Sequence, residues 1–270
     1  MIKITVYIVT KNRVGKLSEA LQSVVDQARP DVELIVVDDG STDTTPEFLS
    51  EYDPGIPFRW CRNEISVGAP SARNKAIQLA TGEYITGLDD DDQFLPGRLK
   101  AFLNQWDDDI SLLTTDDVFL RADGSKIRWR KPKTVSLHNI LFKNLIGNQV
   151  FTRTEYMREV GGFDENLISA QDYDLWIRLI QTFGRAKSIA QPLQVINLSD
   201  STDRISISSE KWLGYYSCYL KHKSLMDPAH RKYQLFTIRQ AQNKPCKGCW
   251  MSWVPFRFWI KEAAKQFFRT

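Results

Sequence analysis

Short apolar runs alternate with segments of helical periodicity over residues 1–115, and this alternation restricts the possible folds more than any other feature of the sequence. Strand–helix–strand repeats build a mostly parallel sheet with helices on both faces, so a Rossmann-like α/β fold is expected. The expected strands are Ile2–Thr10, Glu33–Val37, Phe58–Cys61, Tyr84–Leu88 and Ile110–Thr115. The expected helices are Leu17–Ala28, Thr44–Tyr52, Ala69–Ala80 (with Gly82 as its C-cap) and Pro96–Trp106.

The pattern changes after residue 115. Asp123-Gly124 predicts a hairpin turn between Val118–Leu120 and Lys126–Trp129. Further along, Asn148–Thr152 is typical of a strand and Gln171–Phe183 of an amphipathic helix.

The charge is unevenly distributed. Residues 1–203 carry 23 Lys and Arg against 30 Asp and Glu, a net charge of −7, whereas residues 204–270 carry 13 against 3, a net charge of +10. The second segment, expected to be helical from Ser208, therefore faces either an anionic partner or solvent.

Composition excludes several classes. The longest stretch without Asp, Glu, Lys or Arg is the 12 residues Ser188–Ser199, and a membrane-spanning helix needs about 20 apolar residues. No signal peptide is expected, because the apolar start is short and lacks a small-residue cleavage site. With four cysteines in 270 residues, a reducing cytoplasm is the expected location.

Polar residues follow three of the expected strands, at Thr10–Arg13, Asp38–Ser41 and Asp89–Asp92. In a parallel sheet these strand ends share one edge, where ligands bind. Four consecutive aspartates repel one another, and a hard divalent cation would relieve that repulsion. A solvated acidic loop is the alternative explanation.

Other polar residues have local explanations as well as functional ones. Asp38 and Asp39 suit a turn before a helix, or a contact with a base or ribose. Arg73 is either a surface residue or a phosphate ligand. Asp172 either complements the dipole of the helix that it opens or acts as a general base.

Five segments appear in an order and spacing that resemble the family 2 glycosyltransferases of the GT-A fold, of the bacterial lipopolysaccharide or surface-polysaccharide type. They are VTKNR, VVDDGSTDTT, SVGAPSARNKAIQLATGEYITGLDDDD, GGFDENL and QDYDLWIRL. The resemblance covers residues 2 to about 200. It implies a catalytic domain over 1–205, with a donor-binding half (1–115) and an acceptor-binding half (116–205). The tail after residue 205 lies outside the resemblance, and its charge and helical pattern predict a basic helical extension over 206–270.

The resemblance also implies roles for individual residues. The nucleotide-sugar side comprises Thr10, Asn12, Arg13, Asp38, Asp39, Arg73, Asn74, Asp89 and Asp90. The metal motif maps to Asp89 and Asp91, which would bind Mn²⁺ or Mg²⁺, and the catalytic base maps to Asp172. The implied reaction is inverting transfer of a sugar from a nucleotide-diphosphate sugar, a UDP-sugar being the commonest donor of the family, to a glycan or lipid-linked acceptor.

Two features depart from the family pattern. Gln171 replaces the first acid of a Glu-Asp pair, which keeps hydrogen bonding but removes a charge. There is also no His between residues 138 and 222 to help hold the metal or diphosphate. Asp200 or Asp203 is a substitute ligand, and Arg204 a diphosphate contact.

The C-terminal segment offers further hypotheses. Residues 250–269 have a basic face and an aromatic-rich face, which suits peripheral contact with the cytoplasmic face of the inner membrane or packing on the catalytic domain. Cys246 and Cys249 have zinc-ligand spacing, which Cys218 and His222 would complete; free thiols are the alternative.

Competing functions remain open at this stage. Lys126–Lys133 is a basic cluster, but no nucleic-acid-binding motif accompanies it, so a solvated hairpin or an anionic acceptor contact is expected and nucleic acid is not. A sugar nucleotidyltransferase would need a glycine-rich loop near the N-terminus, and a dehydrogenase would need G-x-G-x-x-G. A non-catalytic carbohydrate-binding protein would need no base at Asp172. Oligomeric state is not indicated.

Overall fold

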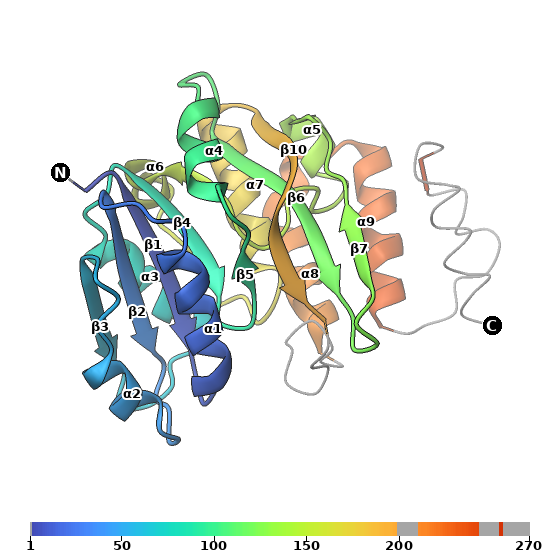
Figure 1. The fold of residues 1–270 in the computed structure, drawn as a ribbon. Helices are drawn as coiled ribbons and strands as arrows, with labels where there is room; N and C mark the ends of the chain where they lie inside the picture. Colours follow the sequence, from blue (N-terminus) through green and yellow to red (C-terminus); the bar gives the residue numbers. More distant parts are fainter. Residues whose placement is uncertain (1, 199–209, 243–253, 256–270) are drawn as a thin grey trace.

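The computed structural model describes residues 2–198, 210–242 and 254–255. In this part of the chain one sheet has the strand order β3-β2-β1-β4-β9-β6-β10-β5, with β7 paired to β6 and β8 to β10. Figure 1 shows helices on both faces of the sheet. The predicted α/β architecture is confirmed.

The elements have the following bounds. The strands are β1 (Ile4–Thr10), β2 (Val32–Asp38), β3 (Phe58–Arg62), β4 (Tyr84–Asp89), β5 (Gln93–Phe94), β6 (Leu112–Leu120), β7 (Lys126–Trp129), β8 (Thr134–Val135), β9 (Phe151–Arg153) and β10 (Ala186–Asn197). The helices are α1 (Val14–Val25), α2 (Thr45–Glu51), α3 (Ala69–Leu79), α4 (Arg98–Gln105), α5 (Leu137–Ile140), α6 (Thr154–Glu159), α7 (Gln171–Phe183), α8 (Lys211–His222), the 3₁₀ turn η2 (Lys223–Leu225) and α9 (Pro228–Ala241).

Alternation along the central strands builds two cores. Side chains of a strand point alternately to opposite faces, so Ile4, Val6 and Ile8 pack in the core beneath α1 and α4. Tyr7 points the other way, into the core shared with α3 and α7. The long ladders β3-β2-β1-β4 are parallel, and Thr10 pairs with Asp38 while Val9 pairs with Asp89. The three polar strand ends therefore lie at one edge, as predicted.

The structure corrects three details. Helix α1 ends at Val25, and Ala28 lies beyond it with φ 49°. Gly82 is no C-cap, because α3 ends at Leu79; a Cβ on Gly82 would instead lie 2.5 Å from the Thr5 backbone nitrogen. The two runs expected at 110–115 and 118–120 belong to the single strand β6.

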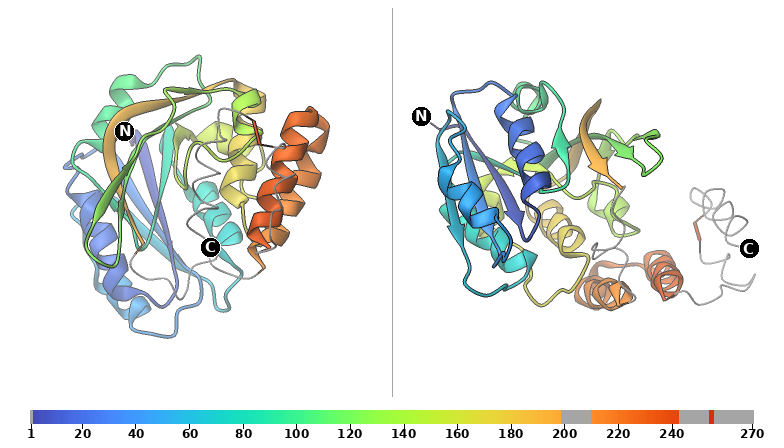
Figure 2. Two further views of the ribbon diagram at one scale, coloured as in Figure 1. Left: turned by 90° about the vertical axis from the view of Figure 1, so that its right-hand side faces the viewer. Right: turned by 60° about the horizontal axis from the view of Figure 1, so that its bottom comes forward.

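The basic C-terminal segment contributes two helices. Helices α8 and α9 lie side by side, and α8 packs against α7 (Figures 1 and 2). Phe142 packs with Tyr233, Phe236 and Val254 in a small separate core. Among the described residues, no helix is long and apolar enough to cross a membrane. The residues 256–269, with Cys246, Cys249, Asp200, Asp203 and Arg204, lie outside the described residues.

Candidate active site

The ends of β1 and β4 are joined by direct contacts. The Thr10 hydroxyl donates to Asp90 Oδ2 at 2.8 Å. The Arg13 guanidinium lies 3.1 Å from Asp90 Oδ1 and 3.5 Å from Asp91 Oδ2. The structure therefore brings two strand ends, 80 residues apart in the chain, into one cluster.

Asn12 connects the first two strand-end loops. It adopts a left-handed backbone conformation (φ 55°), which Asn tolerates better than most residues. Its side-chain oxygen accepts the Thr42 backbone N–H at 2.6 Å, and its own backbone N–H donates to Ser41 Oγ at 2.9 Å. These contacts fix the two loops relative to each other.

Asp38 and Asp39 have different environments. Asp38 is fully buried and accepts the Ser41 backbone N–H at 2.9 Å, as expected of a turn residue. Asp39 accepts four hydrogen bonds of 2.7–2.9 Å from Asn63, Ser66, Val67 and Gly68. Burial raises its pKa, but these donors prevail and hold the pKa of Asp39 below its ordinary value. Asp39 is thus a permanently ionised anchor for the loop over 63–68.

The four aspartates after β4 alternate in exposure. Asp90 and Asp92 are buried, whereas Asp89 and Asp91 are half-buried. Asp89 Oδ1 accepts from Gln149 at 2.7 Å and from Arg73 at 3.0 Å, and its Oδ2 accepts from Asn148 at 2.9 Å. Asp92 accepts from the same Asn148 amide at 2.8 Å.

The electrostatics of this cluster fit a divalent cation. Burial, aided by Asp91 and Asp89, raises the pKa of Asp90 to about 6 despite the Thr10 hydroxyl and Arg13. Burial and the charges of Asp89 and Asp91 also raise the pKa of Asp92 well above its ordinary value. Carboxylates that suppress one another's ionisation are stabilised by a hard cation. Asp89 and Asp91 are the two more accessible members of the cluster.

Asp172 opens α7 and lies beside this cluster. Its Oδ2 accepts from Asn144 at 3.1 Å. Burial raises the pKa of Asp172 to about 6, with the Tyr173 backbone N–H and Arg73 acting in the opposite direction and Asp89 in the same one. Arg73, which pairs with Asp89, is therefore close enough to act on Asp172 as well. Strand β4, helix α3 and helix α7 converge here.

Gln171 does not share the environment of its neighbour Asp172. Its side-chain amide is buried and donates to the Leu167 carbonyl at 2.9 Å. An ionised Glu could not make this bond, because a carboxylate only accepts. The amide at this position thus supports the turn before α7.

Three amide side chains in the segment before β9 were missed by sequence reasoning. Asn144 holds Asp172, and its Oδ1 accepts the Ile146 and Gly147 backbone N–H groups at 2.9 and 3.0 Å. Asn148 bridges Asp89 and Asp92, and Gln149 holds Asp89. Their concentration in the sequence NLIGNQ was the available signal, but amides in an irregular segment also suit ordinary turns.

Asp174 takes part in an ion-pair network that attaches α8. His222 Nε2 lies 2.8 Å from its Oδ1, and Lys221 and Arg178 lie within 2.9 and 2.7 Å of its carboxylate. Burial opposes ionisation, but these partners hold the pKa of Asp174 well below its usual range. Cys218 is close enough to share a metal with Asp174 and His222. Two cations already compensate the carboxylate, so a zinc ion there is not indicated.

The basic cluster at 126–133 was expected to be a solvated hairpin, but two of its side chains form ion pairs within the protein. Arg128 pairs with Asp116 at 2.7 Å, and Lys131 is buried 2.8 Å from Asp117. Burial lowers the pKa of Lys131 to about 8, although Asp117 acts against it. At these positions the charges belong to the fold rather than to an external anion.

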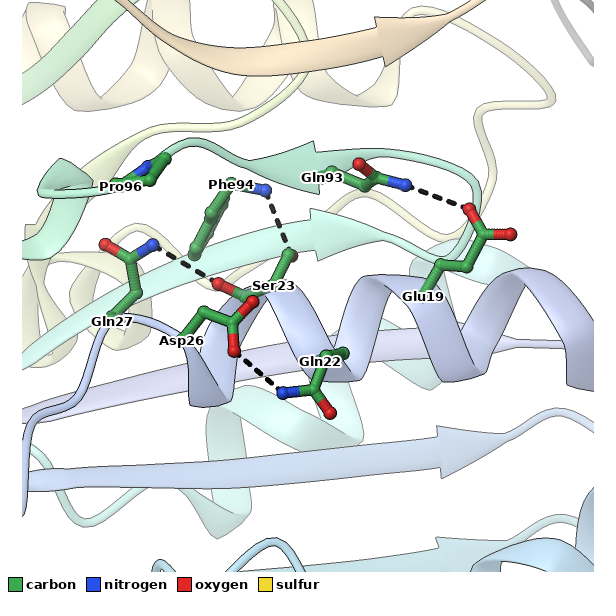
Figure 3. A pocket seen from close by; sticks show the side chains of 8 residues that line it. All are labelled: Glu19, Gln22, Ser23, Asp26, Gln27, Gln93, Phe94 and Pro96. Atoms are coloured by element: carbon green, nitrogen blue, oxygen red, sulfur yellow. Dashed lines mark hydrogen bonds between the residues drawn. The ribbon is translucent and has the colours of Figure 1, made fainter.

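A shallow pocket of about 300 Å³ lies between α1 and β5, and none of the candidate site residues lines it. Figure 3 shows its lining side chains bonded to one another, with Gln93 on Glu19 and the Phe94 backbone on Ser23. Its polar groups are satisfied locally, so it holds no convergent donors for a ligand.

The mostly parallel sheet, with a polar loop after β1 and carboxylates after β2 and β4, is the arrangement expected of a glycosyltransferase of the GT-A type. Residues 5–161 match the family model described as glycosyl transferase family 2, and the chain belongs to this family. The resemblance inferred from the motifs is confirmed.

Two curated relatives are also named as glycosyltransferases. The chain is 36% identical over 256 residues to WcaA of Escherichia coli K12, a glycosyl transferase assigned to colanic acid biosynthesis, covering 89% of this chain and 88% of WcaA. It is 30% identical over 206 residues to the amylovoran biosynthesis glycosyltransferase AmsB of Erwinia amylovora, covering 71% and 68%.

Two solved structures share the fold. One is S. aureus TarS 1–349 in complex with UDP-GlcNAc, with a TM-score of 0.71, 20% identity, and coverage of 96% of this chain and 79% of TarS. The other is the mannosyltransferase PcManGT of Pyrobaculum calidifontis in complex with GDP-Man and Mn²⁺, with a TM-score of 0.67, 18% identity, and coverage of 89% and 72%.

Proposed function

We propose that this glycosyltransferase moves a sugar from a nucleotide-diphosphate sugar to a hydroxyl of a glycan or lipid-linked acceptor, with inversion and with Asp172 as general base. The observation that carries the proposal is the convergence of Asp172 with Asp89 through Arg73 and the amides of 144–149. Two relatives, WcaA and AmsB, are named for colanic acid and amylovoran biosynthesis, and this supports a surface-polysaccharide acceptor.

The donor side is proposed to comprise residues 1–115. Thr10, Asn12, Arg13, Asp38, Asp39, Arg73, Asp89 and Asp90 would shape or contact the nucleotide site. Asp89 and Asp91 would hold Mn²⁺ or Mg²⁺, and a divalent cation stabilises the negative charge of a departing diphosphate. The TarS complex with UDP-GlcNAc and the PcManGT complex with GDP-Man and Mn²⁺ support a nucleotide-sugar donor, and the latter also a Mn²⁺ ion.

The acceptor side is proposed to comprise residues 116–205. The acceptor hydroxyl transfers its proton to the Asp172 carboxylate while its oxygen forms the new bond to the anomeric carbon. The bond between that carbon and the diphosphate oxygen breaks, and the nucleoside diphosphate leaves with the electron pair. A base with a pKa of about 6 is ionised at neutral pH yet close enough to it to accept a proton efficiently.

The proposed location is the cytoplasm, at the inner face of the membrane. The contact expected from 250–269 involves residues of which only Val254 and Pro255 are described, so this part stays a prediction. Liposome flotation of the full chain against a version ending near residue 245 tests it, and equal binding of the two would contradict it.

The reaction is tested with a panel of nucleotide sugars and Mn²⁺, first by thermal shift and then by release of nucleoside diphosphate. Asp172→Asn should keep donor binding and lose about 10²–10⁴-fold in turnover. Asp123→Asn, on an exposed hairpin, is the control and should match the wild type. Near-normal turnover of Asp172→Asn would remove the mechanism, and pyrophosphate as product would indicate nucleotidyl transfer instead.

A further inference from the structure

Tyr215, in the first half of α8, has an exposure that its position on the helix does not explain. Successive residues of a helix are rotated by about 100°, so Tyr215 projects between His222 and Tyr219. Both of those neighbours are buried, at 4% and 6% exposure, because this face of α8 is turned toward the catalytic domain. Tyr215 is nevertheless 39% exposed. Solvent therefore reaches its ring on the domain-facing side of the helix.

Close packing brings this part of α8 against the residues before Asp172. The Ser169 hydroxyl donates to the Lys211 carbonyl at 2.7 Å. A Cβ on Gly214 would lie 2.4 Å from the Ser169 carbonyl oxygen, so a glycine is required for this approach. Tyr215 follows Gly214 directly, and Ser169 precedes Asp172 by three positions.

The electrostatics agree with this placement. Burial raises the pKa of the Tyr215 phenol, and the negative charge of Asp172 is the next contribution. The phenol thus lies within electrostatic reach of the carboxylate. Ile168, beside Ser169, is 50% exposed and adds apolar surface next to the same residues.

The two C-terminal helices hold this arrangement through the residues that follow Asp172. His222 and Lys221 of α8 bind Asp174. On α9, the buried amide of Gln234 donates to the Tyr173 hydroxyl at 2.6 Å. A side chain on α8 is therefore fixed relative to Asp172 and is not carried by a loose appendage.

We propose that Tyr215 forms an aromatic wall of the acceptor site and packs against the ring of the sugar whose hydroxyl reacts. This inference rests on the proposed function, because it takes Asp172 as the group that meets the acceptor hydroxyl. A pyranose ring presents an apolar C–H face to such a wall while its hydroxyls point to polar groups. A rigid aromatic side chain with a polar tip suits such a face.

The matched control lies one position along the helix. Tyr216 is 40% exposed, but it is rotated to the outer side of α8 with Leu213 and Leu220. Tyr215→Ala and Tyr216→Ala thus remove the same ring, with nearly the same exposure, from positions about 100° apart around the helix. Tyr215→Phe keeps the ring and removes only the hydroxyl.

The probes are methyl glycosides of glucose, galactose and mannose, used with UDP or GDP and Mn²⁺. Saturation-transfer NMR reports sugar binding without turnover, and nucleoside diphosphate release with each glycoside as acceptor reports KM. Tyr215→Ala should raise the acceptor KM about tenfold or more and weaken the saturation signal, with the donor KM unchanged. Tyr216→Ala and Tyr215→Phe should stay within about threefold of the wild type.

Equal effects of Tyr215→Ala and Tyr216→Ala, or equal losses in Tyr215→Ala and Tyr215→Phe, would overturn the assignment. So would a wild-type protein that binds none of the glycosides. Failure of the proposed function looks different: the wild type would then release no nucleoside diphosphate from any donor, while the NMR comparison would still assess Tyr215. Unchanged circular dichroism and thermal midpoints show that each variant folds.

Discussion

Replacing Asp172 by Asn should stabilise the protein while it lowers turnover about 10²–10⁴-fold. Burial raises the pKa of this carboxyl from 3.8 to about 6, so its ionisation is harder in the folded chain than in the unfolded one. The difference corresponds to about 3 kcal/mol of lost stability once the group is ionised in both states. Asn keeps an oxygen that can accept from Asn144 and carries no charge, so it avoids this cost.

The size of this stability difference depends on pH. Because the folded pKa is the higher one, the destabilisation by Asp172 is complete above about pH 6 and disappears below about pH 4. At about pH 8 the Asn variant should therefore melt several degrees above the wild type, since 1 kcal/mol moves Tm by roughly 2–4 °C at this size. At about pH 4 the two should melt together.

The assay is a series of thermal melts between about pH 4 and pH 8, without nucleotide or metal. Asp123→Asn makes the same Asp-to-Asn change at an exposed position and is the control. A pH-independent difference, or an Asn variant less stable than the wild type at the upper end, would refute the reasoning. The same series on turnover should show the wild-type rate rising with pH to a plateau above about pH 6, because the base must be ionised.

Three further outcomes follow from the contacts around the site. Asp91→Ala, or a chelator added to the wild type, should abolish the Mn²⁺-dependent thermal shift with a nucleotide sugar; an unchanged shift would exclude Asp91 as a ligand. Gln171→Glu should cost about 1–3 kcal/mol in urea unfolding at about pH 8 and less at about pH 5, because only a protonated Glu can donate to Leu167; no cost at either pH would contradict the contact. Asp174→Ala should cost about 3–5 kcal/mol, since it leaves His222 and its cationic neighbours without their buried partner; a loss below about 1 kcal/mol would mean that the network is dispensable.

The donor side was largely predictable because it is built from strand ends. Asp38, Asp89 and Thr10 each end a short strand-like segment, and the rule that parallel strands share one carboxyl edge places them together without any coordinates. One prediction that was wrong in this part of the chain concerned a local feature, the role of Gly82. Gly82 resembled a helix cap but serves a close backbone approach to Thr5, and a sequence does not distinguish these two uses of glycine.

The acceptor side was predictable only in part, because long-range contacts assemble it. Asp172 was identified through the family motif, and its helix through apolar periodicity. Neither the amide bridge of Asn148 between Asp89 and Asp92 nor the burial of Lys131 beside Asp117 has a periodic signal. No sequence pattern indicates the proposed role of Tyr215 either, since that role depends on how α8 packs against Ser169, 46 residues earlier in the chain.

Three consecutive residues connect the chemistry to the C-terminal helices. Asp172 lies within electrostatic reach of Asp89, Tyr173 is held by α9 through Gln234, and Asp174 is held by α8 through His222. A helix presents adjacent residues at about 100° from one another, so one turn of α7 can meet the substrate side and both C-terminal helices at once. Because the contacts of α8 run to this turn and to the residues just before it, substitutions on α8 can reshape the acceptor surface while the strand-end loops of the donor side keep their geometry.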